Sequence, residues 1–141
     1  KVNEINKLDI PFDFKYIGFL NDDRVLALAY QMADIFVCSS TEDAGPMMIN
    51  EAIICGTPVV SFDMGVAPDL VHNGKTGYRA ALKNSTDLAK GIEAILSLSP
   101  EQAQLMSKKC RDLGVQLFNP DIQVNQFMKL FESLKENNIK C

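Results

Sequence analysis

The sequence predicts an α/β fold in which a parallel sheet is covered by helices on both faces. Short apolar runs alternate with longer segments of helical spacing from residue 12 to residue 80. The run at residues 35–40 is continuously apolar until it ends in two serines, and the run at residues 57–62 is similar. Runs of this kind are typical of strands that are buried on both faces, and strands that alternate with helices pair in parallel.

Each element of the alternating part has its own signal in the sequence. We expect strands at residues 12–19, 35–40, 57–62 and 77–80. We expect helices at residues 21–34 and 47–56, with a single helical turn at residues 69–72 inside a longer loop. Asn21 and Asp22 are typical N-cap residues for the first of these helices, and Gly56 is a typical C-terminal stop for the second.

The rest of the chain is purely helical in pattern and ends the fold in two or three helices. The first covers residues 86–98. The second begins after Ser99-Pro100, and Gln102 completes a capping box with Ser99. The third begins after Asn119-Pro120 and is amphipathic.

Length, composition and charge indicate one domain of ordinary type. The 141 residues are enough for a single core, and neither a repeat nor a linker divides residues 1–141. The net charge of −4 gives no general attraction for nucleic acid. Four cysteines without a C-x-x-C pair and a single histidine predict reduced thiols in a cytosolic protein and no metal site. The chain starts without Met and without a signal peptide, so we expect a fragment of a longer protein.

Ligands of such sheets bind where strands end and helices begin, which selects the loops at residues 20–23, 39–48 and 63–68. The middle loop is chemically the richest. Glu42 and Asp43 precede three small residues, and the free N–H groups of the next helix can donate to hydroxyl or phosphate oxygens. Glu51 follows about one turn into that helix, where its carboxylate could accept from both hydroxyls of a ribose.

Ordinary structural roles explain the same residues equally well at this point. Glu42 and Asp43 could simply complement the positive end of a helix, and Glu51 could be a solvated surface residue. His72, the only histidine, lies before a turn and is more typical of a solvated side chain than of a catalytic base.

Several motifs, in order, resemble the family 4 retaining glycosyltransferases of the GT-B fold. The central stretch SSTEDAGPMMINEAIICGTPVVSF is similar to the family's Glu-x7-Glu motif, and Glu51-Ala52, Gly56 and Pro58-Val59 match its second half in register. Upstream, YIGFL and Ala33-Asp34 fit the family pattern, and downstream APDLVHNGKTGYRA does so as well. The resemblance implies a Rossmann-like C-terminal half of a GT-B enzyme, which binds the nucleotide-sugar donor.

The resemblance also implies roles for individual residues. Glu51 would hold the ribose, and Asp43 would contact hydroxyls of the donor sugar as the candidate catalytic residue. The base pocket would be formed by the segment that contains Gly18, Leu20 and Asp22. The donor sugar and diphosphate would lie against the loop and helix start, formed by Glu42, Ala44, Gly45, Pro46, Met47, Met48 and Ile49.

Two departures from the family pattern affect the catalytic part of this interpretation. The first acidic position carries Asp43 where Glu is usual, and Glu42 is one residue earlier, so either side chain could fill that position. The family's Arg and Lys, which neutralise the leaving diphosphate, have no counterpart before residue 16. We therefore expect this polypeptide alone to be inactive, as half of a two-domain enzyme.

The predicted function is that of a donor-binding domain in a glycosyltransferase that retains the anomeric configuration. The donor would be UDP- or GDP-linked, without a metal or other cofactor, and the acceptor a glycan or lipid-linked sugar bound by an N-terminal domain. A bacterial surface polysaccharide is the expected product. The protein is expected in the cytoplasm, and the sequence leaves open whether it contacts the inner face of the membrane. A non-catalytic nucleotide-sugar-binding module and a sugar-nucleotide epimerase of GT-B fold are the alternatives. Base, sugar, acceptor, linkage and oligomeric state do not follow from the sequence.

Overall fold

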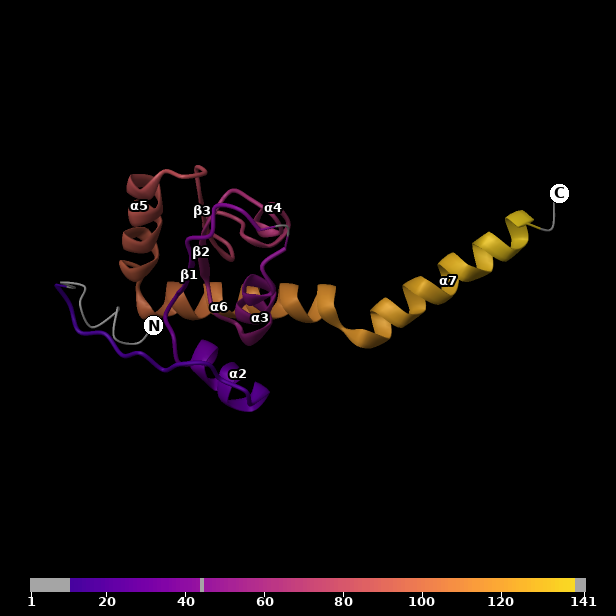
Figure 1. Ribbon diagram of the computed structural model, residues 1–141, viewed down its shortest axis with the longest axis horizontal. Coiled ribbons are helices and arrows are strands. Elements are labelled where there is room, and N and C mark those ends of the chain that lie inside the picture. The colour runs from indigo at the N-terminus through magenta and orange to yellow at the C-terminus, as the bar shows by residue number, and fades with distance from the viewer. Residues whose placement is uncertain (1–10, 44, 139–141) are drawn as a thin grey trace.

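The computed structural model describes residues 11–43 and 45–138, with side chains as far as residue 135. Within these residues three parallel strands form one sheet in the order β1-β2-β3, and helices lie on both of its faces (Figure 1). The strands are β1 (Phe36–Cys38), β2 (Val59–Phe62) and β3 (Gly77–Ala80). The helices are α2 (Asp23–Gln31), α3 (Met47–Cys55), α4 (Ala67–Leu70), α5 (Ser85–Leu96), α6 (Pro100–Phe118) and α7 (Pro120–Asn138).

The core consists of two apolar clusters, one on each face of the sheet, and the central strand β2 contributes to both. Val59 belongs to the cluster shared with α2, α3, α4 and α6, while Val60 and Phe62 belong to the cluster shared mainly with α5. All four residues of β2 are buried, because successive side chains of a strand point to opposite faces and both faces are covered here. The predicted α/β fold with helices on both faces is confirmed.

Helix boundaries follow the capping residues that the sequence indicates. The carboxylate of Asp22 accepts hydrogen bonds from the N–H groups of Arg24 and Val25 at the start of α2. Gly56 ends α3 in the left-handed region at φ +85, and its N–H donates to the carbonyl of Ile53. Ser99 and Gln102 form the predicted capping box of α6.

The predicted strand at residues 12–19 is wrong, because these residues form neither a strand nor a helix. A strand is stabilised by hydrogen bonds to a neighbouring strand, and within the described ranges no segment pairs with this one. The aromatic side chains that suggested a strand, among them Phe14, Tyr16 and Phe19, are exposed. Gly18 interrupts the extended backbone at φ +72.

Two further predictions need correction in detail. The strand at residues 35–40 is shorter, and it is covered on one face only: Val37 is 38% exposed. Helix α5 covers one face of the sheet at β2 and β3, and it leaves that face uncovered at β1. The helical turn expected at residues 69–72 lies at Ala67–Leu70, because Pro68 fits the first turn of a helix.

The three C-terminal helices are present as predicted. α6 runs beneath the sheet, and α7 extends away from the body of the molecule (Figure 1). From Pro120 to Lys135 no side chain of α7 is buried. None of the helices in the described part of the chain is both long and apolar enough to cross a membrane.

The cysteines of the described residues, Cys38, Cys55 and Cys110, have free thiols. Cys110 is fully buried in the core on the α3 side of the sheet, and its thiol contacts the carbonyl oxygen of Thr76 at 3.3 Å. Burial raises the pKa of this thiol to about 12, so Cys110 is a neutral packing residue. Cys141 lies outside the described residues.

Candidate functional site

The candidate site is the start of α3, at the carboxyl end of β1. Its N-cap residue, Pro46, has extended backbone angles, and its side chain makes no capping hydrogen bond. The first turn of α3 holds no acidic side chain that would compensate the positive end of the helix. Because the first N–H groups of a helix have no partner inside the helix, this end is suited to an anionic or hydroxyl-bearing ligand.

Glu51 lies one turn after Met47 on the same helix, and its carboxylate has a fixed partner. The hydroxyl of Tyr30 on α2 donates a hydrogen bond of 3.0 Å to Oε2 of Glu51. Glu51 itself is only partly buried, so the carboxylate remains accessible to a ligand. A carboxylate has about four acceptor sites, and the bond to Tyr30 uses one of them.

Tyr30 is the site residue that sequence reasoning missed. Burial raises the pKa of its phenol well above the ordinary value, and the hydrogen bond to the Glu51 carboxylate raises it further. The phenol therefore stays protonated and acts as a donor toward Glu51. A signal was available in the helical spacing, because Tyr30 lies four residues after the partly buried Leu26, on the inward face of α2. A buried tyrosine generally requires a partner for its hydroxyl.

The acidic loop before α3 is exposed, and part of it is held by a local hydrogen bond. Oδ1 of Asp43 accepts from the N–H of Gly45 at 3.0 Å, which forms a turn within the loop. Glu42 is exposed, and Ala44 lies outside the described residues. The space beside Gly45 is open, since a Cβ placed there would meet no atom within 4 Å. A ligand could therefore approach the backbone at this point.

The predicted base-pocket residues are not brought to this loop. The segment that carries Gly18 and Leu20 lies apart from the loop between β1 and α3 (Figure 1). Asp22 is engaged as the N-cap of α2, where one carboxylate oxygen accepts from two backbone N–H groups. The residues predicted to contact the diphosphate, Met47, Met48 and Ile49, lie on α3 together with Glu51, which is predicted to contact the ribose. The structure therefore brings these two parts of the predicted site together, but not the predicted base pocket.

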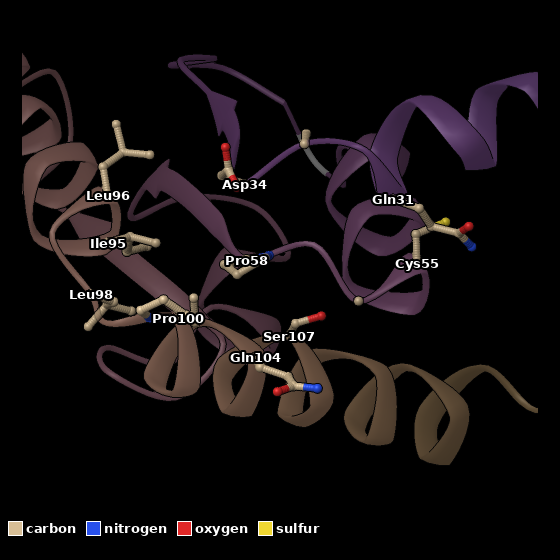
Figure 2. A pocket seen from close by; sticks show the side chains of 13 residues that line it. Gln31, Asp34, Cys55, Pro58, Ile95, Leu96, Leu98, Pro100, Gln104 and Ser107 are labelled. Atoms are coloured by element: carbon tan, nitrogen blue, oxygen red, sulfur yellow. The ribbon is translucent and has the colours of Figure 1, made fainter.

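A cavity of about 720 Å³ lies at the opposite end of the sheet, where the strands begin. Figure 2 shows its lining between the end of α3 and the start of α6, with Asp34 and Pro58 preceding β1 and β2. Asp34 is the one charged side chain in the lining, and a carboxylate repels phosphate. The cavity is therefore poorly suited to a nucleoside diphosphate, and the start of α3 remains the better candidate on chemical grounds.

A second cavity, of about 660 Å³, adjoins the first along α6 and is lined by Lys108, Arg111 and Glu101 among others. Arg111 donates to the carbonyl oxygen of Ile54 in the last turn of α3, so its guanidinium is occupied with the end of that helix. Within residues 11–43 and 45–138, no group of three or more His, Cys, Asp or Glu side chains is placed to hold a metal ion.

Comparison with known families identifies the chain. The sequence profile of the family described as "Glycosyl transferases group 1" matches residues 1–112, which is most of the chain. The chain belongs to this family. The match covers the whole sheet and all of the candidate site, and it ends within α6.

Two known proteins are similar to the chain over most of its length. The N-acetyl-alpha-D-glucosaminyl L-malate synthase of Bacillus anthracis is 26% identical over an alignment of 119 positions, which covers 78% of this chain and 31% of that protein. The N,N'-diacetylbacillosaminyl-diphospho-undecaprenol alpha-1,3-N-acetylgalactosaminyltransferase of Campylobacter jejuni is 27% identical over 86% of this chain and 31% of its own length. The matched part of the chain thus spans about a third of the length of each of these two relatives.

The fold has a counterpart among solved structures. HepE of Anabaena, solved in complex with UDP and glucose, superposes with a TM-score of 0.72 at 25% identity. The superposition covers 96% of this chain and 35% of HepE, which has also been solved with UDP-glucose. The chain therefore has the α/β fold of the C-terminal domains of GT-B glycosyltransferases.

Proposed function

We propose that the chain is the donor-binding domain of a glycosyltransferase that moves a sugar from a nucleotide-sugar to an acceptor with retention of configuration. One observation carries the proposal: α3 begins at the carboxyl end of β1 without a side-chain cap, and Glu51 follows one turn later with its carboxylate held by Tyr30. This combination offers donors for a diphosphate and an acceptor for ribose hydroxyls within one helical turn. Membership of the glycosyl transferases group 1 family supports transfer over the epimerase alternative.

The roles of the individual residues are part of this proposal. Glu51 accepts from the ribose, and the first N–H groups of α3, those of Met47 and Met48, donate to the diphosphate and the donor sugar. Asp43 contacts a hydroxyl of the sugar through the carboxylate oxygen that is not bonded to Gly45. The segment containing Gly18, Leu20 and Asp22 is proposed as the base pocket, while the carboxylate of Asp22 caps α2 in this structure. No metal is required in this scheme.

The start of α3 would also contribute to the chemical step. Negative charge develops on the diphosphate as the bond to the sugar breaks, and the sugar becomes oxocarbenium-like. The partial positive charge at the helix start is present before the reaction and stabilises that charge without reorganisation. The acceptor would be a glycan or lipid-linked sugar held by another domain of the full-length enzyme, in the cytoplasm and in peripheral contact with the membrane.

Nucleotide binding tests the proposal directly. Isothermal titration calorimetry of the chain with UDP and with GDP should detect one of them, and HepE makes UDP the first choice. Glu51→Ala should weaken binding by about tenfold or more, because it removes up to two charge-assisted hydrogen bonds of roughly 1.5–3 kcal/mol each. Glu51→Gln keeps an acceptor for Tyr30 and should weaken binding less.

A matched control excludes a general effect of removing a helical carboxylate. Glu93 is exposed on α5, which covers the other face of the sheet, and Glu93→Ala should bind as the native chain does. Equal affinities of the native chain and of Glu51→Ala would contradict the proposed site, as would the absence of binding to either nucleotide at millimolar concentration.

A further inference from the structure

We infer that Tyr30 is a positioning residue for nucleotide binding: its hydroxyl holds the Glu51 carboxylate in the orientation that accepts the ribose. The inference rests on the proposed function, since it assigns a role that Tyr30 has only if Glu51 binds the ribose. It is carried by the hydrogen bond of 3.0 Å between the Tyr30 hydroxyl and Oε2 of Glu51, two residues 21 positions apart in the chain.

The ring of Tyr30 is itself held in one position by independent contacts. Only 8% of the residue is exposed, within the core cluster on the α3 side of the sheet. The ring of Phe36 on β1 meets it edge to face, with centroids 5.4 Å apart and planes at 80°. The hydroxyl is therefore presented to Glu51 by a rigid side chain that is anchored on the sheet.

The backbone of Tyr30 is held at the C-terminal end of α3 by a second hydrogen bond. The hydroxyl of the buried Thr57, which follows the C-cap of α3, donates to the carbonyl oxygen of Tyr30 at 2.7 Å. Tyr30 therefore contacts α3 in its middle, through Glu51, and beyond its end, through Thr57. Helices α2 and α3 are consequently held in a fixed relation at the site.

Fixing the carboxylate favours binding because a free glutamate side chain loses rotamer freedom when it is immobilised by a ligand. With Oε2 held by Tyr30, the remaining acceptor sites of the carboxylate are presented in one arrangement before the nucleotide arrives. The raised pKa of the Tyr30 phenol agrees with this role, since the group stays a donor throughout the pH range in which proteins function.

The test compares Tyr30→Phe with the native chain for two ligands. One ligand is UDP, or GDP if that is the nucleotide bound, and the other is its 2′,3′-dideoxy counterpart. The loss of one hydrogen bond should weaken binding of the ribose form by about three- to tenfold and leave binding of the dideoxy form within about twofold. In a Glu51→Ala background, where the Tyr30 hydroxyl has lost its acceptor on α3, Tyr30→Phe should have little further effect on either ligand.

A control comes from the second tyrosine that donates to a carboxylate. The hydroxyl of Tyr78 bonds Oδ1 of Asp87 at 2.9 Å on the α5 side of the sheet, so Tyr78→Phe should bind both ligands as the native chain does. If Tyr30→Phe melts below the temperature of measurement, Phe36→Leu replaces it, because that change removes the ring contact and leaves the Tyr30 hydroxyl in place. A loss confined to the ribose form is expected for this variant as well.

The outcomes separate the inference from the function on which it rests. Unchanged ribose binding by Tyr30→Phe, together with a loss in Glu51→Gln, overturns the positioning role and leaves the proposed site intact. An equal loss for both ligands also overturns it, since Tyr30 would then support the fold alone. A native chain that binds neither nucleotide, or that does not distinguish ribose from dideoxyribose, overturns the proposed function and the inference together.

Discussion

Among the described residues, two tyrosine hydroxyls donate to carboxylates, and their surroundings give the two pairs different properties. Tyr30 is buried and bonds Glu51 on the α3 side of the sheet. Tyr78 bonds Asp87, whose other oxygen accepts from the N–H of Ala81 at 2.7 Å. The pKa of Asp87 is held below its usual value, first by the backbone N–H of Ala81 and then by the hydroxyl of Tyr78. Asp87 thus fastens the start of α5 to the end of β3.

The pair at Asp87 predicts a contribution to acid stability. Because the pKa of Asp87 is lower in the folded chain than in the unfolded chain, its stabilising contribution is present above the unfolded pKa and is lost as pH falls through the folded one. The free energy of unfolding of the native chain should therefore fall more steeply below about pH 4 than that of Asp87→Asn. Urea unfolding at a series of pH values measures both, and parallel curves would show that Asp87 has no such role.

At the scale of elements, the contact between α3 and α6 is the closest helix packing around the candidate site. Gly114 of α6 lies against the backbone of α3, and a Cβ placed on it would come within 2.6 Å of the Cα of Ile54. Arg111, one turn earlier on α6, donates to the carbonyl of the same Ile54. The end of α3 is therefore fixed by α6, while its start is left open for a ligand.

This packing predicts that Gly114→Ala destabilises the protein, although alanine is the better helix former by about 1 kcal/mol. The added methyl group would have to displace backbone atoms, so we expect a net loss of about 1–3 kcal/mol in the free energy of unfolding. Gln116→Ala, at an exposed position of the same helix, should change stability by less than about 0.5 kcal/mol. Chemical denaturation of both variants is the measurement, and a stabilised Gly114→Ala would refute the close packing.

The elements that could be predicted from the sequence are those whose signals are local. Asp22, Gly56 and Ser99 mark helix ends through hydrogen bonds to their own neighbours, and each lies where it was expected. The strand at residues 12–19 was wrong because a strand depends on a partner that lies elsewhere in the chain. Exposure of Val37 was missed for a related reason, since it depends on where α5 packs.

The candidate site also shows that local sequence signals do not reveal contacts made by tertiary packing. The role of Glu51 in ribose binding stays a prediction from its motif and its place one turn into a helix, and the structure gives its carboxylate a partner that the motif does not contain. Tyr30 reaches Glu51 only because α2 packs against α3, a contact between helices on either side of β1 in the chain. Local patterns therefore point to Glu51 as a candidate, and tertiary packing was needed to find the hydroxyl that holds its carboxylate.

At the scale of the whole molecule, the body and the last helix differ in how they are stabilised. The body has buried clusters on both faces of the sheet. Helix α7 has no buried side chain from Pro120 to Lys135, and Phe127 and Phe131 stack on each other at its surface with centroids 6.4 Å apart. A helix that packs against little depends on its own propensity, whereas most of the stability of helices in proteins comes from tertiary packing.

Hydrogen exchange should report this difference. Backbone amides of β2 and α3 are expected to exchange only through global unfolding, whereas those of α7 should exchange faster by several orders of magnitude. Mass spectrometry of peptides from the isolated chain measures both regions in one experiment. Protection of α7 equal to that of β2 would mean that the helix is covered in solution, for example by a second copy of the chain.

The short edge strand β1 has a consequence for the behaviour of the protein in solution. An edge of a sheet with unpaired N–H and C=O groups can act as a template for strands of other molecules, which leads to aggregation. Strand β1 comprises only Phe36–Cys38, so an incoming strand would find few positions to pair with before the chain turns away into the loop. The brevity of this strand therefore limits edge-to-edge growth without a proline or a charged side chain in the strand itself.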